Sequence, residues 1–124
     1  MPIRKGALGH IVLNVADLRK SENFYRAILG LQISARNRSI KMTFLSYGRE
    51  HHDLALRQIP RGSKTVGGRG VPKLHHFCIY VGSNGIIDKL YPILRRRKIP
   101  IVSGPETLVV AGNVNKFKYD DRKK

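Results

Sequence analysis

The chain has 124 residues, of which 24 are Lys or Arg and 8 are Asp or Glu, so its net charge is +16 at pH 7. This length suits one domain with a modest core, and no apolar run reaches the roughly 20 residues that a membrane-spanning helix needs. The N-terminal stretch lacks the apolar segment of a secretory signal, and the single cysteine, Cys78, rules out an internal disulfide. These features predict a cytoplasmic protein. The excess positive charge makes nucleic acid a candidate partner, although basic clusters of this kind also occur as plain solvated faces.

The first predicted elements are a strand and a helix. An apolar stretch predicts the strand over 8–15. A helix over 18–29 follows, with Asp17 as its N-cap and Gly30 just past its C-terminal end.

Two further strand-like stretches, 40–47 and 53–59, complete the first half of the chain. This half is predicted to follow the order β-α-β-β-β, in which these three strands are the ones located in the sequence. The next segment, 61–73, is rich in glycine and basic residues, and this composition is typical of a linker.

The second half repeats the first without a gap when the sequence is shifted so that His76 falls on His10. The segment LHHFCIYV at 74–81 then aligns with LGHIVLNV at 8–15, which predicts a second opening strand. An internal repeat is strong evidence about architecture. Two copies are too few for a solenoid, but they suit a pair of modules related by a pseudo-two-fold axis.

The second half is too short to finish this pattern. A helix over 86–97 and the stretch 99–106 continue it, and one more strand is predicted at about 114–120. No further strand follows. The predicted fold is therefore α+β, with two tandem βαβββ modules forming a cupped mixed sheet, the second module lacking its last strand. Within a single domain, module one spans about 7–60, the linker 61–73 and module two 74–124.

Strand periodicity places polar side chains together on the two opening strands. His10 and Asn14 share one face of the first strand, and His76 and Tyr80 share the corresponding face of its repeat. The opposite faces are apolar. Polar groups on the inner side of a cupped sheet indicate a pocket, so Asn14 and Tyr80 are candidate pocket residues, with satisfied core polar groups as the alternative.

Three stretches of the sequence resemble one protein family. They are LGHIVLNVADLRKSENFYRAILGLQIS, MTFLSYGREHHDLAL and GVPKLHHFCIYVGS. Together they resemble the vicinal oxygen chelate superfamily, which includes glyoxalase I, bleomycin-resistance proteins and extradiol dioxygenases. The pairing of HHDLAL with a downstream LHHF is most similar to the type I extradiol dioxygenases and their single-domain relatives.

The resemblance implies roles for particular histidines. In the family, the histidine on the first strand of each module binds the metal, which implies that His10 and His76 are ligands. In extradiol enzymes the second histidine of the HH pair is an acid/base on the bound catechol and oxygen, which implies this role for His52 and leaves His51 structural. Glyoxalases commonly have a metal-binding Glu where this chain has Ala55, so the resemblance weighs against a four-ligand site.

The resemblance also implies a third ligand, a carboxylate from the final strand, that this chain lacks at the expected place. The sequence ends in KYDDRKK, so Asp120 and Asp121 are the nearest candidates, and Tyr119 is the candidate for the family's pocket tyrosine. Three explanations stay open: a truncated or altered C-terminus, a carboxylate from a partner chain, or loss of the metal with the fold kept for binding.

The function that the resemblance implies is extradiol cleavage of a catecholic aromatic substrate by O₂, impaired if the carboxylate is absent. Two imidazoles and one carboxylate form the facial triad that holds Fe(II), with Mn(II) or another divalent metal as alternatives. The alternatives are a non-catalytic small-molecule-binding protein of the bleomycin-resistance type and a glyoxalase I-like lyase, so enzymatic activity itself is open. The family implies a homodimer.

Overall fold

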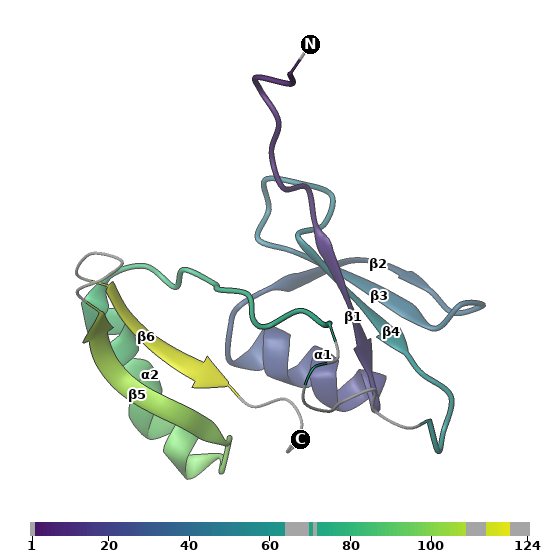
Figure 1. Cartoon of the computed structure of the whole chain (residues 1–124). Coiled ribbons are helices and arrows are strands. Elements are labelled where there is room, and N and C mark those ends of the chain that lie inside the picture. The colour runs from purple at the N-terminus through teal and green to yellow at the C-terminus, as the bar shows by residue number, and fades with distance from the viewer. Residues whose placement is uncertain (1, 64–69, 71, 109–113, 120–124) are drawn as a thin grey trace. The chain divides into compact units, whose positions relative to one another are not determined.

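The chain divides into two units, Met1–Val71 and Pro72–Lys124 (Figure 1). The computed structural model describes residues 2–63, 70, 72–108 and 114–119. Each unit combines one helix with strands, so the predicted α+β class is confirmed.

The first unit contains one helix and four strands. Their bounds are β1 Ile11–Val15, α1 Leu18–Ala27, β2 Gln32–Asn37, β3 Met42–Ser46 and β4 Leu54–Gln58. The strands form one mixed sheet in the order β1-β4-β3-β2, in which β1 runs parallel to β4 and the other neighbours are antiparallel (Figure 1). The predicted order β-α-β-β-β is therefore confirmed for this unit.

Local signals fix both ends of α1. The carboxylate of Asp17 accepts a hydrogen bond from the backbone N–H of Lys20 at 3.1 Å, as an N-cap does. The helix ends at Ala27, two residues before the predicted boundary. Gly30 lies beyond it in the left-handed region, with φ of 77°, where its N–H bonds the carbonyl of Arg26.

The core of the first unit lies between α1 and one face of the sheet. Leu45 and Leu56 are fully buried on this face. Thr43, on the same face, donates a hydrogen bond to Glu22 of α1. Phe24 of α1 is also buried. Burying one leucine contributes roughly 1.5–3 kcal/mol, so these contacts are the main reason the helix stays on the sheet.

Gln58, the last residue of β4, ties the sheet to the start of α1. Its side-chain oxygen accepts a hydrogen bond from the N–H of Leu18 at 2.7 Å, and its side-chain nitrogen donates to the carbonyls of Ala16 and Ile59. The turn between β1 and α1 is thus held by a residue that comes about 40 positions later in the chain.

The second unit contains one helix and a two-stranded antiparallel sheet. The bounds are α2 Asn84–Arg96, β5 Ile101–Leu108 and β6 Val114–Tyr119. α2 contacts both strands, and it buries Ile87 and Leu94. The predicted helix and the predicted strand at about 114–120 are confirmed to within two residues, and the stretch 99–106 overlaps β5.

The prediction of a strand over 74–81 was wrong, because these residues form no regular element in the described structure. In the first unit, the equivalent strand β1 lies at the edge of its sheet and pairs with β4. The described part of the second unit has no strand that corresponds to β4. A strand needs a partner for its backbone hydrogen bonds, so without that closing strand the repeated sequence stays irregular.

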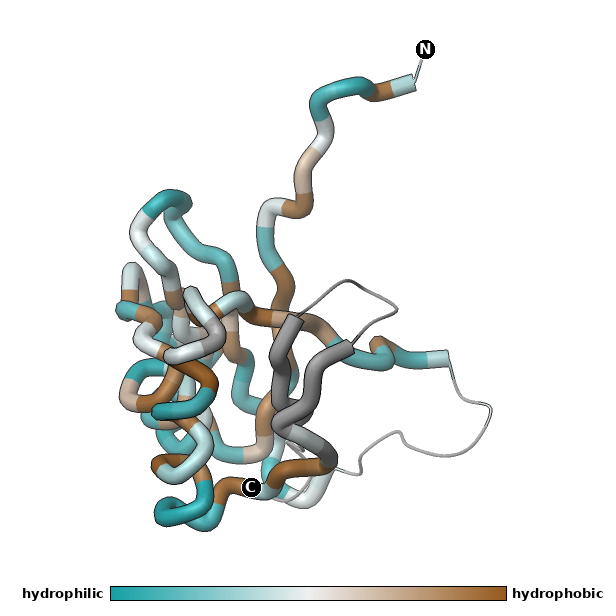
Figure 2. Tube along the Cα trace, turned by 90° about the vertical axis from the view of Figure 1, so that its left-hand side faces the viewer, coloured by the Kyte–Doolittle hydropathy of each residue, from teal (hydrophilic) through white to brown (hydrophobic). Residues whose placement is uncertain are grey.

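No helix among the described residues is long and apolar enough to cross a membrane. Hydrophobic and hydrophilic positions alternate along the trace instead of gathering in one long apolar stretch (Figure 2).

Candidate functional site

The sheet of the first unit has a second face, turned away from α1. Strand pairing places Val12 of β1 and Phe44 of β3 on either side of Ala55 of β4, so these three residues share this face. Val12 is 47% exposed and Phe44 is half-buried, while the small Ala55 is fully covered by its neighbours. A metal-binding side chain is therefore absent at the position where glyoxalases were expected to carry one.

His10 and His52 lie together at one end of this face. His10 directly precedes β1, and His52 lies two residues before β4. The parallel pairing starts with Ile11 opposite Leu54, and the N–H of Ile11 donates to the carbonyl of Asp53 at 3.2 Å. This register brings the two imidazole centroids to 4.3 Å, with their planes tilted by 52°.

Phe44 and His51 complete the surroundings of His52. The ring of Phe44 meets that of His52 edge to face, with centroids 5.0 Å apart. The Nδ1 atoms of His51 and His52 are 2.8 Å apart, so one of them donates a hydrogen bond to the other. Sequence reasoning missed Phe44, although strand alternation could have found it, because it directly faces Ala55.

The environment of His52 favours the neutral imidazole. Burial lowers the pKa of His52 below its ordinary value of 6.5, nearby His10 and His51 lower it further, and Asp53 opposes the shift. A neutral imidazole with a free ring nitrogen accepts a proton at neutral pH, which is the property of a general base.

The loop that carries the histidine pair is held by Asp53 and Tyr47. The carboxylate of Asp53 accepts a hydrogen bond from the N–H of Tyr47 at 2.9 Å, and the N–H of Asp53 donates to the carbonyl of Leu45 at 2.9 Å. The hydroxyl of Tyr47 donates to the carbonyl of Leu29 at 2.8 Å. Burial raises the pKa of Tyr47, and the charge of Asp53 adds to this effect, so the hydroxyl keeps its proton for that bond.

The other predicted site residues lie elsewhere on β1, in the second unit, or outside the described part of the structure. Asn14 is exposed on the same face of β1 as Val12. His76 and Tyr80 belong to the second unit and are exposed, Tyr80 to 82%. Tyr119 ends β6, but its side chain lies outside the described part of the structure, as do Asp120 and Asp121.

The ring nitrogens of His76 are close to those of its neighbour. The Nδ1 atoms of His75 and His76 are 2.6 Å apart, so the second HH pair has the same internal contact as the first.

Among the described residues, no three His, Cys, Asp or Glu side chains lie close enough to hold a metal ion. In the described part of the first unit, His10 and His52 lie together, but Asp53 does not join them in a group that could hold a metal ion, and its carboxylate accepts the N–H of Tyr47. A complete facial triad of two histidines and one carboxylate is therefore not present within the described residues of this unit.

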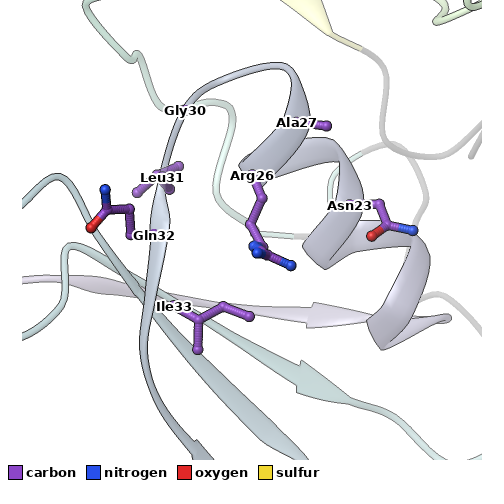
Figure 3. A pocket seen from close by; sticks show the side chains of 7 residues that line it. All are labelled: Asn23, Arg26, Ala27, Gly30, Leu31, Gln32 and Ile33. Carbon is purple, nitrogen blue, oxygen red and sulfur yellow. The ribbon is translucent and has the colours of Figure 1, made fainter.

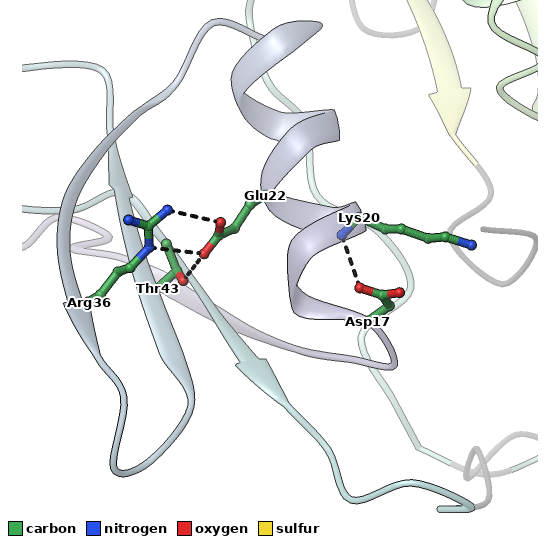
Figure 4. A network of polar contacts seen from close by, with 5 residues as sticks. All are labelled: Asp17, Lys20, Glu22, Arg36 and Thr43. Atoms are coloured by element: carbon green, nitrogen blue, oxygen red, sulfur yellow. Dashed lines mark hydrogen bonds and ion pairs between the residues drawn. The ribbon is translucent and has the colours of Figure 1, made fainter.

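Glu22, the buried carboxylate of the first unit, is already bound elsewhere. It forms an ion pair with Arg36 at 3.2 Å and accepts a hydrogen bond from Thr43 (Figure 4). Burial alone would raise the pKa of Glu22, but the hydrogen bonds from Arg36 and Thr43 and the charges of Arg36 and Arg26 lower it overall. Because this carboxylate lies on the α1 side of the sheet, it cannot reach the face that carries His10.

An open pocket of the first unit lies away from the histidines, between the end of α1 and the start of β2 (Figure 3). Its lining residues are Asn23, Arg26, Ala27, Gly30, Leu31, Gln32 and Ile33. No residue predicted to act in the site is among them.

The sequence matches the family described as the Glyoxalase/Bleomycin resistance protein/Dioxygenase superfamily over residues 7–118. The chain belongs to this superfamily. The family resemblance inferred from the sequence is therefore confirmed, while the particular reaction is not decided by it.

Two curated relatives carry out different reactions. The chain is 30% identical to the mitochondrial methylmalonyl-CoA epimerase of Homo sapiens over 105 residues, which are 79% of this chain and 57% of the epimerase. It is 34% identical to 3-methylcatechol 2,3-dioxygenase of Pseudomonas putida over 88 residues, which are 65% of this chain and 26% of the dioxygenase. The chain thus spans about half the length of the epimerase and about a quarter of the dioxygenase.

Two solved structures have a similar fold. An integron cassette protein from the mobile metagenome of a Halifax Harbour sewage outfall has a TM-score of 0.61 and 21% identity, covering 87% of this chain and 83% of its own. The glyoxalase I of Leishmania major has a TM-score of 0.56 and 24% identity, covering 94% of this chain and 81% of its own.

Proposed function

We propose that the protein is a metal-dependent enzyme of the extradiol dioxygenase type that acts on a catecholic aromatic compound. The observation that carries this proposal is the contact between His10 and His52, whose ring centroids lie 4.3 Å apart. A ligand histidine beside a second, neutral histidine is the arrangement that catechol deprotonation needs. The identity with 3-methylcatechol 2,3-dioxygenase supports the same choice.

The proposed metal ligands are His10 and His76, and Fe(II) is the proposed ion, with Mn(II) or another divalent metal as the alternative. Such an ion, when bound, would supply a positive charge and open positions for the catecholate and O₂. The carboxylate of the triad is not among the described residues. In this proposal it comes from Asp120, Asp121 or a second copy of the chain in a homodimer.

The proposed role of His52 is to take the proton of a catechol hydroxyl and later return it. Its lowered pKa supports this role, because the base must be neutral before the substrate proton arrives. Phe44 packs against His52 and limits the access of water to it on one side. Val12, which is 47% exposed beside Ala55, would offer an apolar surface to the aromatic ring. Asn14, Tyr80 and Tyr119 are proposed as lining residues.

The test combines metal content with turnover. The protein is reconstituted with Fe(II) under anaerobic conditions, and bound iron, oxygen uptake and ring-cleavage product from 3-methylcatechol are measured. We expect H10A and H76A to lose the iron. The variant H75A is the matched control for H76A and should keep it.

The variant H52A distinguishes the proposed proton transfer by His52 from the proposed metal binding by His10 and His76. It should retain iron but lose about 10²- to 10⁴-fold in kcat, the usual contribution of a general acid or base. H51A changes the neighbouring imidazole and should cost much less. Iron bound equally by all variants, or no ring cleavage by the iron-loaded protein, would contradict the proposal.

A second candidate is an epimerase-type reaction, in which a proton is removed next to a thioester carbonyl. It is favoured by the 30% identity with methylmalonyl-CoA epimerase, which covers more of this chain than the dioxygenase match does. Exchange of the substrate α-proton with deuterated water, without oxygen uptake, identifies this reaction. Binding of an aromatic ligand without either reaction would instead indicate a non-catalytic member of the bleomycin-resistance type.

A further inference from the structure

Four consecutive cations occupy the C-terminal end of α2. They are Arg95, Arg96, Arg97 and Lys98, here called the basic segment, and all four are exposed. The helix buries Ile87 and Leu94 toward its own unit. Exposed Lys89 lies two helical turns before Arg96, so it extends the same charged side of the helix.

The basic segment carries more positive charge than is needed to stabilise the C-terminal end of the helix dipole. A helix C-terminus carries about half a negative charge, which one or two cations satisfy. Asp88 is the single acidic residue of α2. None of the four cations forms an ion pair with a described residue, whereas Arg36 of the first unit does. The described residues therefore leave most of the positive charge of the basic segment without an ion-pair partner.

The side chain of Arg95 is held in place before any partner arrives. Its guanidinium donates a hydrogen bond to the hydroxyl of Tyr91 at 3.2 Å and lies 5.8 Å from the centre of that ring. Holding one guanidinium in this way lowers the conformational entropy that is lost when it binds an anion.

The sequence as a whole is also strongly basic. The sequence has 24 basic and 8 acidic residues. Several carboxylates are already bound within the first unit: Asp17 caps α1, Glu22 pairs with Arg36, and Asp53 accepts the N–H of Tyr47.

We propose that the basic segment binds the phosphate backbone of nucleic acid. Three of its four side chains are arginines, whose planar fork fits two phosphate oxygens at once. Contacts with phosphates depend on charge and spacing and do not distinguish bases, so binding should be independent of sequence. It should also weaken strongly as the salt concentration rises. This property is separate from the proposed catalytic function, because it uses none of the histidines.

The experiment measures fluorescence anisotropy of a labelled 20-nucleotide single strand and the matching duplex, in DNA and RNA versions, at several NaCl concentrations. The test variant is R95Q/R96Q/R97Q/K98Q. The matched control is R4Q/K5Q/R19Q/K20Q, which removes the same number of charges from exposed positions of the first unit. Glutamine keeps a good helix propensity in both, and circular dichroism checks the fold.

We expect the test variant to bind at least about tenfold more weakly at 0.1 M salt, and its slope of log K against log salt to be shallower by about 3 to 4. The control variant should change much less. Equal losses in the two variants would show that net charge alone matters and would overturn the proposal. Unchanged binding in the test variant, or tighter binding of the protein to anionic lipid vesicles or poly-glutamate than to nucleic acid, would overturn it as well.

Discussion

His52 and Glu22 lie on opposite faces of the same sheet, and each has a lowered pKa for a different reason. At His52, burial and two neighbouring imidazoles disfavour the charged form. At Glu22, burial also disfavours the charge, but the donors Arg36 and Thr43 overcome it. At neutral pH the histidine is thus neutral and available for proton transfer, while the glutamate is charged and holds structure.

Because of Glu22, the free energy of unfolding should decrease at acidic pH. Its pKa in the folded protein is below the ordinary 4.5, so its stabilisation is complete above that pH and is lost as the pH falls through the folded value. We expect E22Q to lower the free energy of unfolding by about 2 kcal/mol at pH 7, the range of a hydrogen bond to a charged group. The difference from the unmodified protein should shrink below pH 4, measured by urea unfolding.

The control for this prediction is R36Q. Arg36 is 46% exposed, so water can replace part of its contact, and its removal should cost less than that of Glu22. Parallel stability profiles of E22Q and the unmodified protein between pH 3 and 7 would contradict the assigned role of Glu22.

At the scale of elements, sequence reasoning succeeded where the signal is local. Asp17 marks the start of α1 and Gly30 its end, and strand-like stretches mark β3 and β4. It failed at 74–81, where the side chains favour a strand but the strand partner is missing from the described residues. Pairing is a non-local property, so a repeat of the sequence does not guarantee a repeat of the hydrogen bonds.

Gly30 offers a direct test of helix termination. A Cβ at this position would meet no atom within 4 Å, so only its φ of 77° opposes another residue. We expect G30A to lower the free energy of unfolding by about 1–2 kcal/mol, the cost of the left-handed region for an L-residue. Thermal unfolding followed by circular dichroism measures it.

The matched control is G9A. Gly9 also has open space around it but no positive φ, so alanine there should be neutral or slightly stabilising. If G30A and G9A have the same melting temperature, the left-handed conformation of Gly30 is not what limits the helix.

At the scale of the whole molecule, the candidate site could be predicted only in part. The repeat pointed to His10 and His76, and the family resemblance added His52. That His10 would touch His52 depends on the parallel register of β1 and β4, and no sequence pattern states that register. The contribution of Phe44 depends on the same sheet order.

Because of the net charge of +16, added salt should stabilise the folded protein. Like charges repel each other more in the compact state, and salt screens this repulsion, because the Debye length falls from about 30 Å at 0.01 M to about 8 Å at 0.15 M. We expect the melting temperature to rise by a few degrees over this range. Salt also weakens the described ion pair between Arg36 and Glu22, but this loss of stability should be small.

A charge-reduced protein provides the comparison. R95Q/R96Q/R97Q/K98Q has four fewer positive charges, so its melting temperature should rise less with NaCl than that of the unmodified protein. A fall in melting temperature with salt would show that attractive ion pairs outweigh the repulsion.

The order of strands in the first unit also constrains how a nascent chain acquires its structure. β1 is made first, yet within the described sheet it pairs with β4, the last strand of the unit, and Gln58 at the end of β4 secures the turn that follows β1. α1 and the β2–β3 hairpin can form earlier from local contacts. At roughly 5–20 residues per second, the ribosome needs a few seconds to complete β4. During that time Ile11, Leu13 and Val15 have no sheet to join, so the earliest segment of the unit is the one most in need of a chaperone.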